Sequence, residues 1–177
     1  MPRNLLIVAC LLLTTTPGLA QKSKRDKSKK TVSTTEQNYK AIGANLPPLK
    51  FYRRDGVYLT EKDLKKDAPL IIMLFNPTCD HCEDQTRLFQ KHLGIFTNST
   101  LLLMAADKMG PYLGYFVNNT GADNFPSLQI GLDSSEYINK TFRYESLPQI
   151  NIYDKQRKLI KIFTGLTPID SLQAYIQ

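Results

Sequence analysis

Apolar residues in this chain of 177 residues gather into short runs separated by amphipathic stretches. Two runs, 70–75 and 100–106, are apolar at nearly every position, which predicts strands buried on both faces of a sheet. Residues 79–93 lie between them and place apolar side chains at helical spacing. These three segments therefore predict a strand–helix–strand unit, in which a crossover helix joins two parallel strands.

Further elements surround this unit. A hairpin and a capped helical turn are predicted before it, at 46–59 and 60–64. A helix, a strand, a second helix capped by Ser134 or Ser135, a hairpin and a closing helix are predicted after it, at 108–120, 125–132, 134–142, 147–163 and 168–176. The order predicts an α/β fold with a central mixed sheet flanked by helices and preceded by an N-terminal β-hairpin.

The first 20 residues have the pattern of a secretory signal peptide. Arg3 precedes an apolar run over 5–13, and the small-residue ending at Ala20 is typical of a cleavage site. We expect an exported protein, located in the periplasm if the host is Gram-negative, and an uncleaved N-terminal membrane anchor is the alternative. Cys10 lies inside the apolar run and is either a passive member of it or a lipidated residue.

The formal charge of +7 is concentrated near the N-terminus. Residues 1–30 contain seven Lys or Arg and one acid, whereas residues 31–177 contain sixteen Lys or Arg and fifteen acids. We interpret 21–45 as a basic disordered linker, capable of weak contact with anionic membrane surfaces. Residues 46–177 form one nearly neutral domain, which argues against nucleic-acid binding.

Cys79 and Cys82 stand at the expected beginning of the 79–93 helix, directly after a predicted strand. A Cys-x-x-Cys in this place is typical of thiol–disulfide exchange, because the helix N-terminus stabilises a thiolate on the first sulfur. Cys79 is then the nucleophile, and Cys82, one turn later, resolves the mixed disulfide. The alternatives are a structural disulfide or inert thiols, and a metal site built from both cysteines and His81.

The neighbours of the two cysteines tune the thiolate. A protonated His81 would stabilise it, whereas Asp80 would disfavour it by charge repulsion. Thr78 directly precedes the nucleophile.

With these elements and motifs, residues 46–177 resemble the exported thioredoxin-like proteins of the TlpA/ResA group. The resemblance rests on residues 75–82, on Pro148 ahead of the penultimate strand, and on the closing hairpin and helix. It implies a thioredoxin-like fold in which residues from about 108 to 142 are an inserted strand–helix segment. It also implies a thiol:disulfide oxidoreductase that reduces disulfides of partner proteins, receives electrons from a membrane donor, and uses no cofactor or metal.

The resemblance further implies a cis Leu147–Pro148 peptide facing the disulfide, with Leu147 in the substrate groove. Two departures stand out: Thr78 replaces the Trp that usually precedes the first cysteine, and Met73 replaces a buried Asp that accepts protons. Asp84 or Glu83 is a candidate for that proton transfer, although a carboxylate in such a place is more often a solvated charge on the helix face. A thiol peroxidase and a non-catalytic copper-binding or other metal-binding module are alternative functions.

Overall fold

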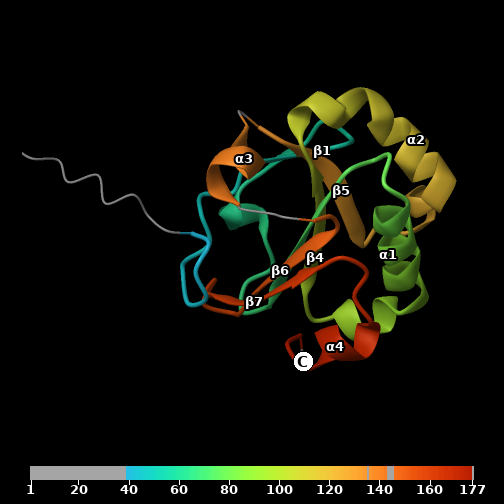
Figure 1. The fold of residues 1–177 in the computed structure, drawn as a ribbon. Helices are drawn as coiled ribbons and strands as arrows, with labels where there is room; N and C mark the ends of the chain where they lie inside the picture. Colours follow the sequence, from blue (N-terminus) through green and yellow to red (C-terminus); the bar gives the residue numbers. More distant parts are fainter. Residues whose placement is uncertain (1–38, 135, 143–145, 177) are drawn as a thin grey trace, which may run out of the picture. The chain divides into compact units, whose positions relative to one another are not determined.

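A mixed sheet of seven strands runs through the described part of the chain (Figure 1). The structure, a computed structural model, describes residues 39–134, 136–142 and 146–176. The predicted signal peptide and most of the basic linker lie outside the described residues. The strands occur in the spatial order β2-β1-β5-β4-β3-β6-β7.

The elements follow the chain order expected from the sequence. The strands are β1 (Phe51–Arg53), β2 (Tyr58–Leu59), β3 (Leu70–Phe75), β4 (Thr100–Ala105), β5 (Leu128–Asp133), β6 (Gln149–Tyr153) and β7 (Leu159–Thr164). The α-helices are α1 (Asp80–Lys91), α2 (Gly110–Thr120), α3 (Tyr137–Thr141) and α4 (Ile169–Gln173). Short 3-10 turns are η1 (Glu61–Asp63), η2 (Leu93–Phe96), η3 (Asp107–Met109) and η4 (Ala122–Asn124).

Strands β3, β4 and β5 are parallel, because helices α1 and α2 carry the chain back between them. Strand β6 pairs antiparallel with β3, and β7 pairs antiparallel with β6. The N-terminal β1–β2 hairpin adds to the opposite edge through β5. The predicted mixed sheet, hairpin and inserted segment are confirmed, and the inserted strand β5 lies between β1 and β4.

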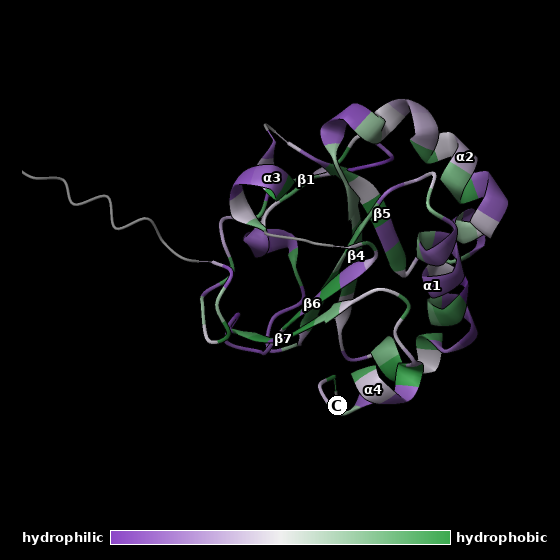
Figure 2. Ribbon diagram, in the orientation of Figure 1, coloured by the Kyte–Doolittle hydropathy of each residue, from purple (hydrophilic) through white to green (hydrophobic). Residues whose placement is uncertain are grey.

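The sheet is buried on both faces. Ile71, Met73 and Phe75 of β3 contribute to one apolar cluster, which also takes side chains from α1, α2 and α4. The alternate residues of β3 contribute to a second cluster with α3 and the N-terminal segment. This arrangement explains why β3 is apolar at every position, and Figure 2 shows hydrophobic colouring along the central strands.

Helix α3 differs from its prediction. The described helix begins at Tyr137, after Glu136 with a left-handed φ of 57°, so it is shorter than 134–142. Its amide at Ile138 donates to the buried carboxylate of Asp133 at 2.8 Å. The cap therefore comes from Asp133 at the end of β5 and not from the Ser134 side chain. Ser135 lies outside the described residues.

The chain before residue 46 also contacts the sheet. Asn45 forms an isolated antiparallel bridge with Lys158, and the Gly43 amide donates to the Leu159 carbonyl at 2.7 Å. Part of the segment interpreted as linker thus covers the start of edge strand β7. In the described residues, no helix combines the length and apolar character that crossing a membrane requires.

Gly131 in β5 tests how closely β1 packs against the inserted strand. A Cβ at this position would overlap the Tyr52 carbonyl oxygen and lie 2.9 Å from the Arg53 Cα. We expect Gly131→Ala to lower the free energy of unfolding by about 2 kcal/mol or more, because the backbone of β1 cannot yield like a flexible side chain. Urea denaturation measures this change.

Gly114→Ala in α2 is the matched control. A Cβ there meets no atom within 4 Å, so the substitution should leave stability unchanged or raise it by up to about 1 kcal/mol. Equal stability of both variants would contradict the proposed close approach of β1 and β5.

Candidate active site

A tight turn connects β3 to α1. The Asn76 side-chain oxygen accepts hydrogen bonds from the Thr78 amide and the Thr78 hydroxyl, both at 3.0 Å. The Asn76 carbonyl accepts from the Cys79 amide at 3.1 Å. An Asn that binds the backbone two residues onward forms a local turn by itself, so this loop places Cys79 without help from distant residues.

Cys79 is the N-cap of α1, as the sequence predicts. Its backbone is extended, with φ −110° and ψ 115°, and its Sγ accepts a hydrogen bond from the Cys82 amide at 3.3 Å. The sulfur thus occupies the place that a Ser or Asp oxygen takes in an ordinary N-cap. Cys79 is half-buried, so part of the residue faces solvent.

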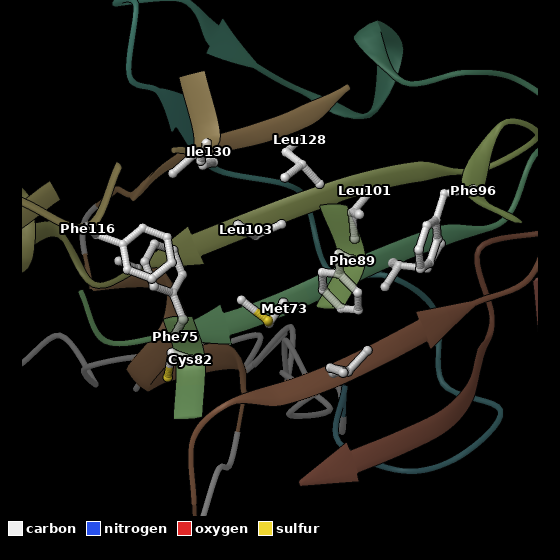
Figure 3. Close-up of a cluster of buried hydrophobic side chains, with 14 of the residues drawn as sticks. Met73, Phe75, Cys82, Phe89, Phe96, Leu101, Leu103, Phe116, Leu128 and Ile130 are labelled. Atoms are coloured by element: carbon white, nitrogen blue, oxygen red, sulfur yellow. The ribbon is translucent and has the colours of Figure 1, made fainter. Parts of the chain in front are cut away.

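Cys82 points into the protein instead. It has no exposed surface and lies in the cluster that contains Met73, Phe75 and Phe116 (Figure 3). Burial raises the pKa of the Cys82 thiol, and its hydrogen bond with Cys79 raises it further. Both cysteines are free thiols in this structure. Cys79 is therefore partly exposed, with a hydrogen-bonded sulfur, while the Cys82 thiol is shielded and protonated at neutral pH.

The remaining residues of the motif face solvent. Thr78, Asp80 and His81 are exposed at the beginning of helix α1, so water screens the Asp80 carboxylate there. Asp80 and Glu83 also lie in the first turn, where a negatively charged side chain interacts favourably with the helix dipole and stabilises the helix.

The two candidate carboxylates for proton transfer differ in environment. Asp84 is exposed and forms an ion pair with Arg87 at 3.2 Å. Glu83 is 5% exposed, and its Oε2 accepts hydrogen bonds from Arg87 Nη2 at 3.0 Å and from Asn119 Nδ2 of α2. The Glu83 carboxylate is thus fixed by hydrogen bonds in the interface between α1 and α2. Glu83 directly follows Cys82 in the sequence.

Pro148 lies at the same end of the sheet as Cys79. Leu74 pairs with Gln149, so the residue ahead of β6 is beside the end of β3. The Leu147–Pro148 peptide is cis, as the resemblance implied, and Pro148 is buried. Leu147 is half-buried and packs against both apolar clusters. Leu147 and Pro148 therefore lie at the end of the sheet where β3 leads into the turn before Cys79.

The loop that follows β7 also borders the site, although the sequence did not predict this. The Gly165 amide donates to the Pro148 carbonyl at 2.8 Å, and the buried side chain of Gln85 in α1 holds Thr167. Leu166, which lies between Gly165 and Thr167 in the sequence, is exposed. The available signal was Gln85 itself, a polar residue at a helix position that turns inward with Cys82 and Phe89.

The aromatic residues of α2 divide between core and surface. Phe116 is fully buried, with its ring centroid 4.4 Å from that of Phe75, whereas Tyr112 and Tyr115 are about half exposed. Among the described residues, no group of three or more His, Cys, Asp or Glu side chains gathers to form a metal site.

Comparison with known proteins identifies the fold. No family model matches the chain, and no curated protein sequence matches it. Solved structures do match, including a candidate protein disulfide isomerase from Bacteroides thetaiotaomicron, with a TM-score of 0.64 and 17% identity over 76% of this chain and 87% of that one. The thioredoxin domain of a thiol-disulfide oxidoreductase from Bacteroides vulgatus matches with a TM-score of 0.62 and 13% identity, over 77% and 99%.

StoA from Bacillus subtilis is a third similar structure, with a TM-score of 0.57 and 14% identity over 73% of this chain and 96% of that one. At these identities the similarity concerns the fold. The chain therefore has the thioredoxin-like fold that the sequence resemblance implied.

The contrast between a half-buried Cys79 and a buried Cys82 predicts selective alkylation. With the reduced native protein at pH 7–8, iodoacetamide should modify Cys79 and leave Cys82 unmodified, because Cys82 is buried and its pKa is raised. Peptide mass spectrometry measures the extent of labelling at each residue. Unfolding in urea is the control and should expose both sulfurs. Comparable labelling of Cys82 in the native protein would contradict the assigned geometry.

Proposed function

We propose that the protein is a thiol:disulfide oxidoreductase that reduces disulfides in partner proteins through Cys79 and Cys82. The observation that carries this proposal is the asymmetric pair: a half-buried Cys79 whose sulfur caps helix α1, followed one turn later by a buried Cys82 thiol. The similar structures support this proposal, since they include a thiol-disulfide oxidoreductase and a candidate disulfide isomerase.

The reaction proceeds in two exchanges. The Cys79 thiolate attacks one sulfur of the substrate disulfide, forming a mixed disulfide and releasing the other substrate sulfur as a thiolate that takes up a proton. Cys82 then loses its proton and attacks the Cys79 sulfur. This step forms the Cys79–Cys82 disulfide and releases the second substrate thiol. The substrate gains two electrons, and a dithiol reductant returns the protein to its starting state.

Burial of Cys82 suits the second exchange. A thiol with a raised pKa does not compete for the substrate, because little of it is thiolate at neutral pH. In the mixed disulfide, Cys82 is already one helical turn from its target, so the resolving step is intramolecular and fast. The acceptor of its proton is Glu83 or water, since Met73 supplies no acidic group.

Protein substrates bind at Leu147 and Pro148. Pro148 has no amide proton, and an extended substrate segment pairs with the backbone that precedes it. Thr78, Asp80 and His81 lie exposed on the first turn and set the local charge that such a segment meets.

Export and direction belong to the same proposal. The N-terminal segment supports an exported protein of the TlpA/ResA type, periplasmic in a Gram-negative host, with its basic linker near the membrane surface. A membrane protein then supplies the electrons. Disulfides persist in such compartments, so a reductase there acts on chosen partners and not on the whole thiol pool.

Insulin reduction tests the catalytic role. With dithiothreitol as the reductant, the wild type should accelerate insulin precipitation, and Cys79→Ser should abolish the acceleration because the attacking sulfur is missing. Cys82→Ser should be trapped as a mixed disulfide that gel electrophoresis detects. No acceleration by the wild type would overturn the proposed activity and favour a binding module.

The reduction potential tests the direction. Equilibration with glutathione buffers should place the Cys79–Cys82 pair at or below about −250 mV, as for reducing thioredoxins. A value near about −120 mV would show instead that the protein introduces disulfides.

A further inference from the structure

Gln85 is fully buried, and both polar atoms of its side-chain amide form hydrogen bonds with the backbone of Thr167. Its Oε1 accepts from the Thr167 amide at 2.7 Å, and its Nε2 donates to the Thr167 carbonyl at 3.2 Å. Gln85 lies three residues after Cys82 in α1, and Thr167 lies in the loop between β7 and α4. The helix that carries the thiols is thereby joined to this loop.

The loop turns its polar groups inward. The Thr167 hydroxyl donates to the Gly165 carbonyl at 3.1 Å, and the Gly165 amide donates to the Pro148 carbonyl at 2.8 Å. Gly165 has a φ of +74°, which favours glycine and allows the sharp turn. These bonds form a continuous connection from α1 through Thr167 and Gly165 to Pro148.

Leu166 is left pointing outward by this arrangement. Its side chain is 51% exposed, although Thr167 beside it is only 4% exposed. The sheet register places it near the site, because Gln149 pairs with Leu74 on one side and with Thr164 on the other. A single exposed leucine is common on protein surfaces and needs no explanation. Here the two buried hydrogen bonds between Gln85 and Thr167, which we call the Gln85 clamp, fix the backbone beside the leucine and indicate a role.

We propose that Gln85 is a positioning residue for protein substrates: it holds the Gly165–Thr167 loop so that Leu166 offers an apolar contact beside Pro148. The contact serves a polypeptide whose disulfide Cys79 attacks, so the inference rests on the proposed function. A small disulfide reaches the Cys79 sulfur without extending over the loop.

Removing the clamp releases the loop. Without the Gln85 amide, the N–H and C=O of Thr167 are buried without partners, and such groups carry a large desolvation cost. The loop relieves this cost by moving toward water, which displaces Leu166. Loss of one leucine contact with the bound polypeptide corresponds to a decrease of about tenfold in kcat/KM for a protein substrate.

Gln85→Met tests the proposal, since Met has similar volume but neither hydrogen bond. The full-length protein is assayed with dithiothreitol and two substrates, insulin and 2-hydroxyethyl disulfide. We expect kcat/KM for insulin to fall about tenfold through a higher KM, with the small disulfide changed by less than about twofold.

Gln90→Met is the matched control on the same helix. Gln90 Nε2 also bonds a backbone carbonyl, that of Thr120 at 3.1 Å, but at the end of α2 and not at the Pro148 loop. This variant should leave the ratio between the two substrates unchanged.

Leu166→Ser tests the contact without touching the interior. We expect a higher KM for insulin and an unchanged melting temperature. Ile42→Ser is its control, because Ile42 is 63% exposed and precedes Gly43, which bonds Leu159 at the opposite end of β7.

Three outcomes decide the matter. Loss confined to insulin in Gln85→Met and Leu166→Ser supports the proposal. Equal loss on both substrates, or no loss, overturns it, because Gln85 would then serve only the fold or nothing in catalysis. A wild type that exchanges neither disulfide overturns the proposed function itself, a result separate from either.

Discussion

The hydrogen bond from the Cys82 amide to the Cys79 sulfur defines the beginning of helix α1 and the arrangement of the site. It uses one of the unpaired amides of the first helical turn and so gives the Cys79 sulfur a fixed place. Because the same turn directs Cys82 inward, one local interaction separates a half-buried cysteine from a buried one. The difference in their chemistry follows from this geometry and from burial.

The sheet supplies the support for that helix end. Strand β3 is buried on both faces and paired on both sides, which leaves little freedom in the position of Phe75, its last residue. The Asn76 turn then spans only a few residues before the cap. A paired strand and a short turn position the Cys79 side chain more precisely than a long loop can.

Buried polar side chains connect α1 to its surroundings at two places. Glu83 accepts hydrogen bonds from Arg87 and Asn119 and so joins α1 to α2, while Gln85 joins it to the loop after β7. Apolar packing alone would allow α1 to slide on the sheet, but directional hydrogen bonds to fixed partners do not. The helix carrying the thiols is thus held on both flanks.

Local patterns in the sequence determined the elements, the helix start at Cys79 and the two thiols, because each depends on residues within one turn or one strand. The prediction that a serine caps α3 was wrong, because the Asp133 carboxylate accepts the hydrogen bond from the Ile138 amide five residues later. Residue propensities do not predict a cap across such a distance. Only the tertiary structure brought Gln85 to Thr167, 82 residues away, and buried Glu83 against Asn119. A helical pattern shows which side of a helix turns inward, but it does not show which backbone groups lie opposite that side. The packing of the helix against the rest of the chain determines those partners.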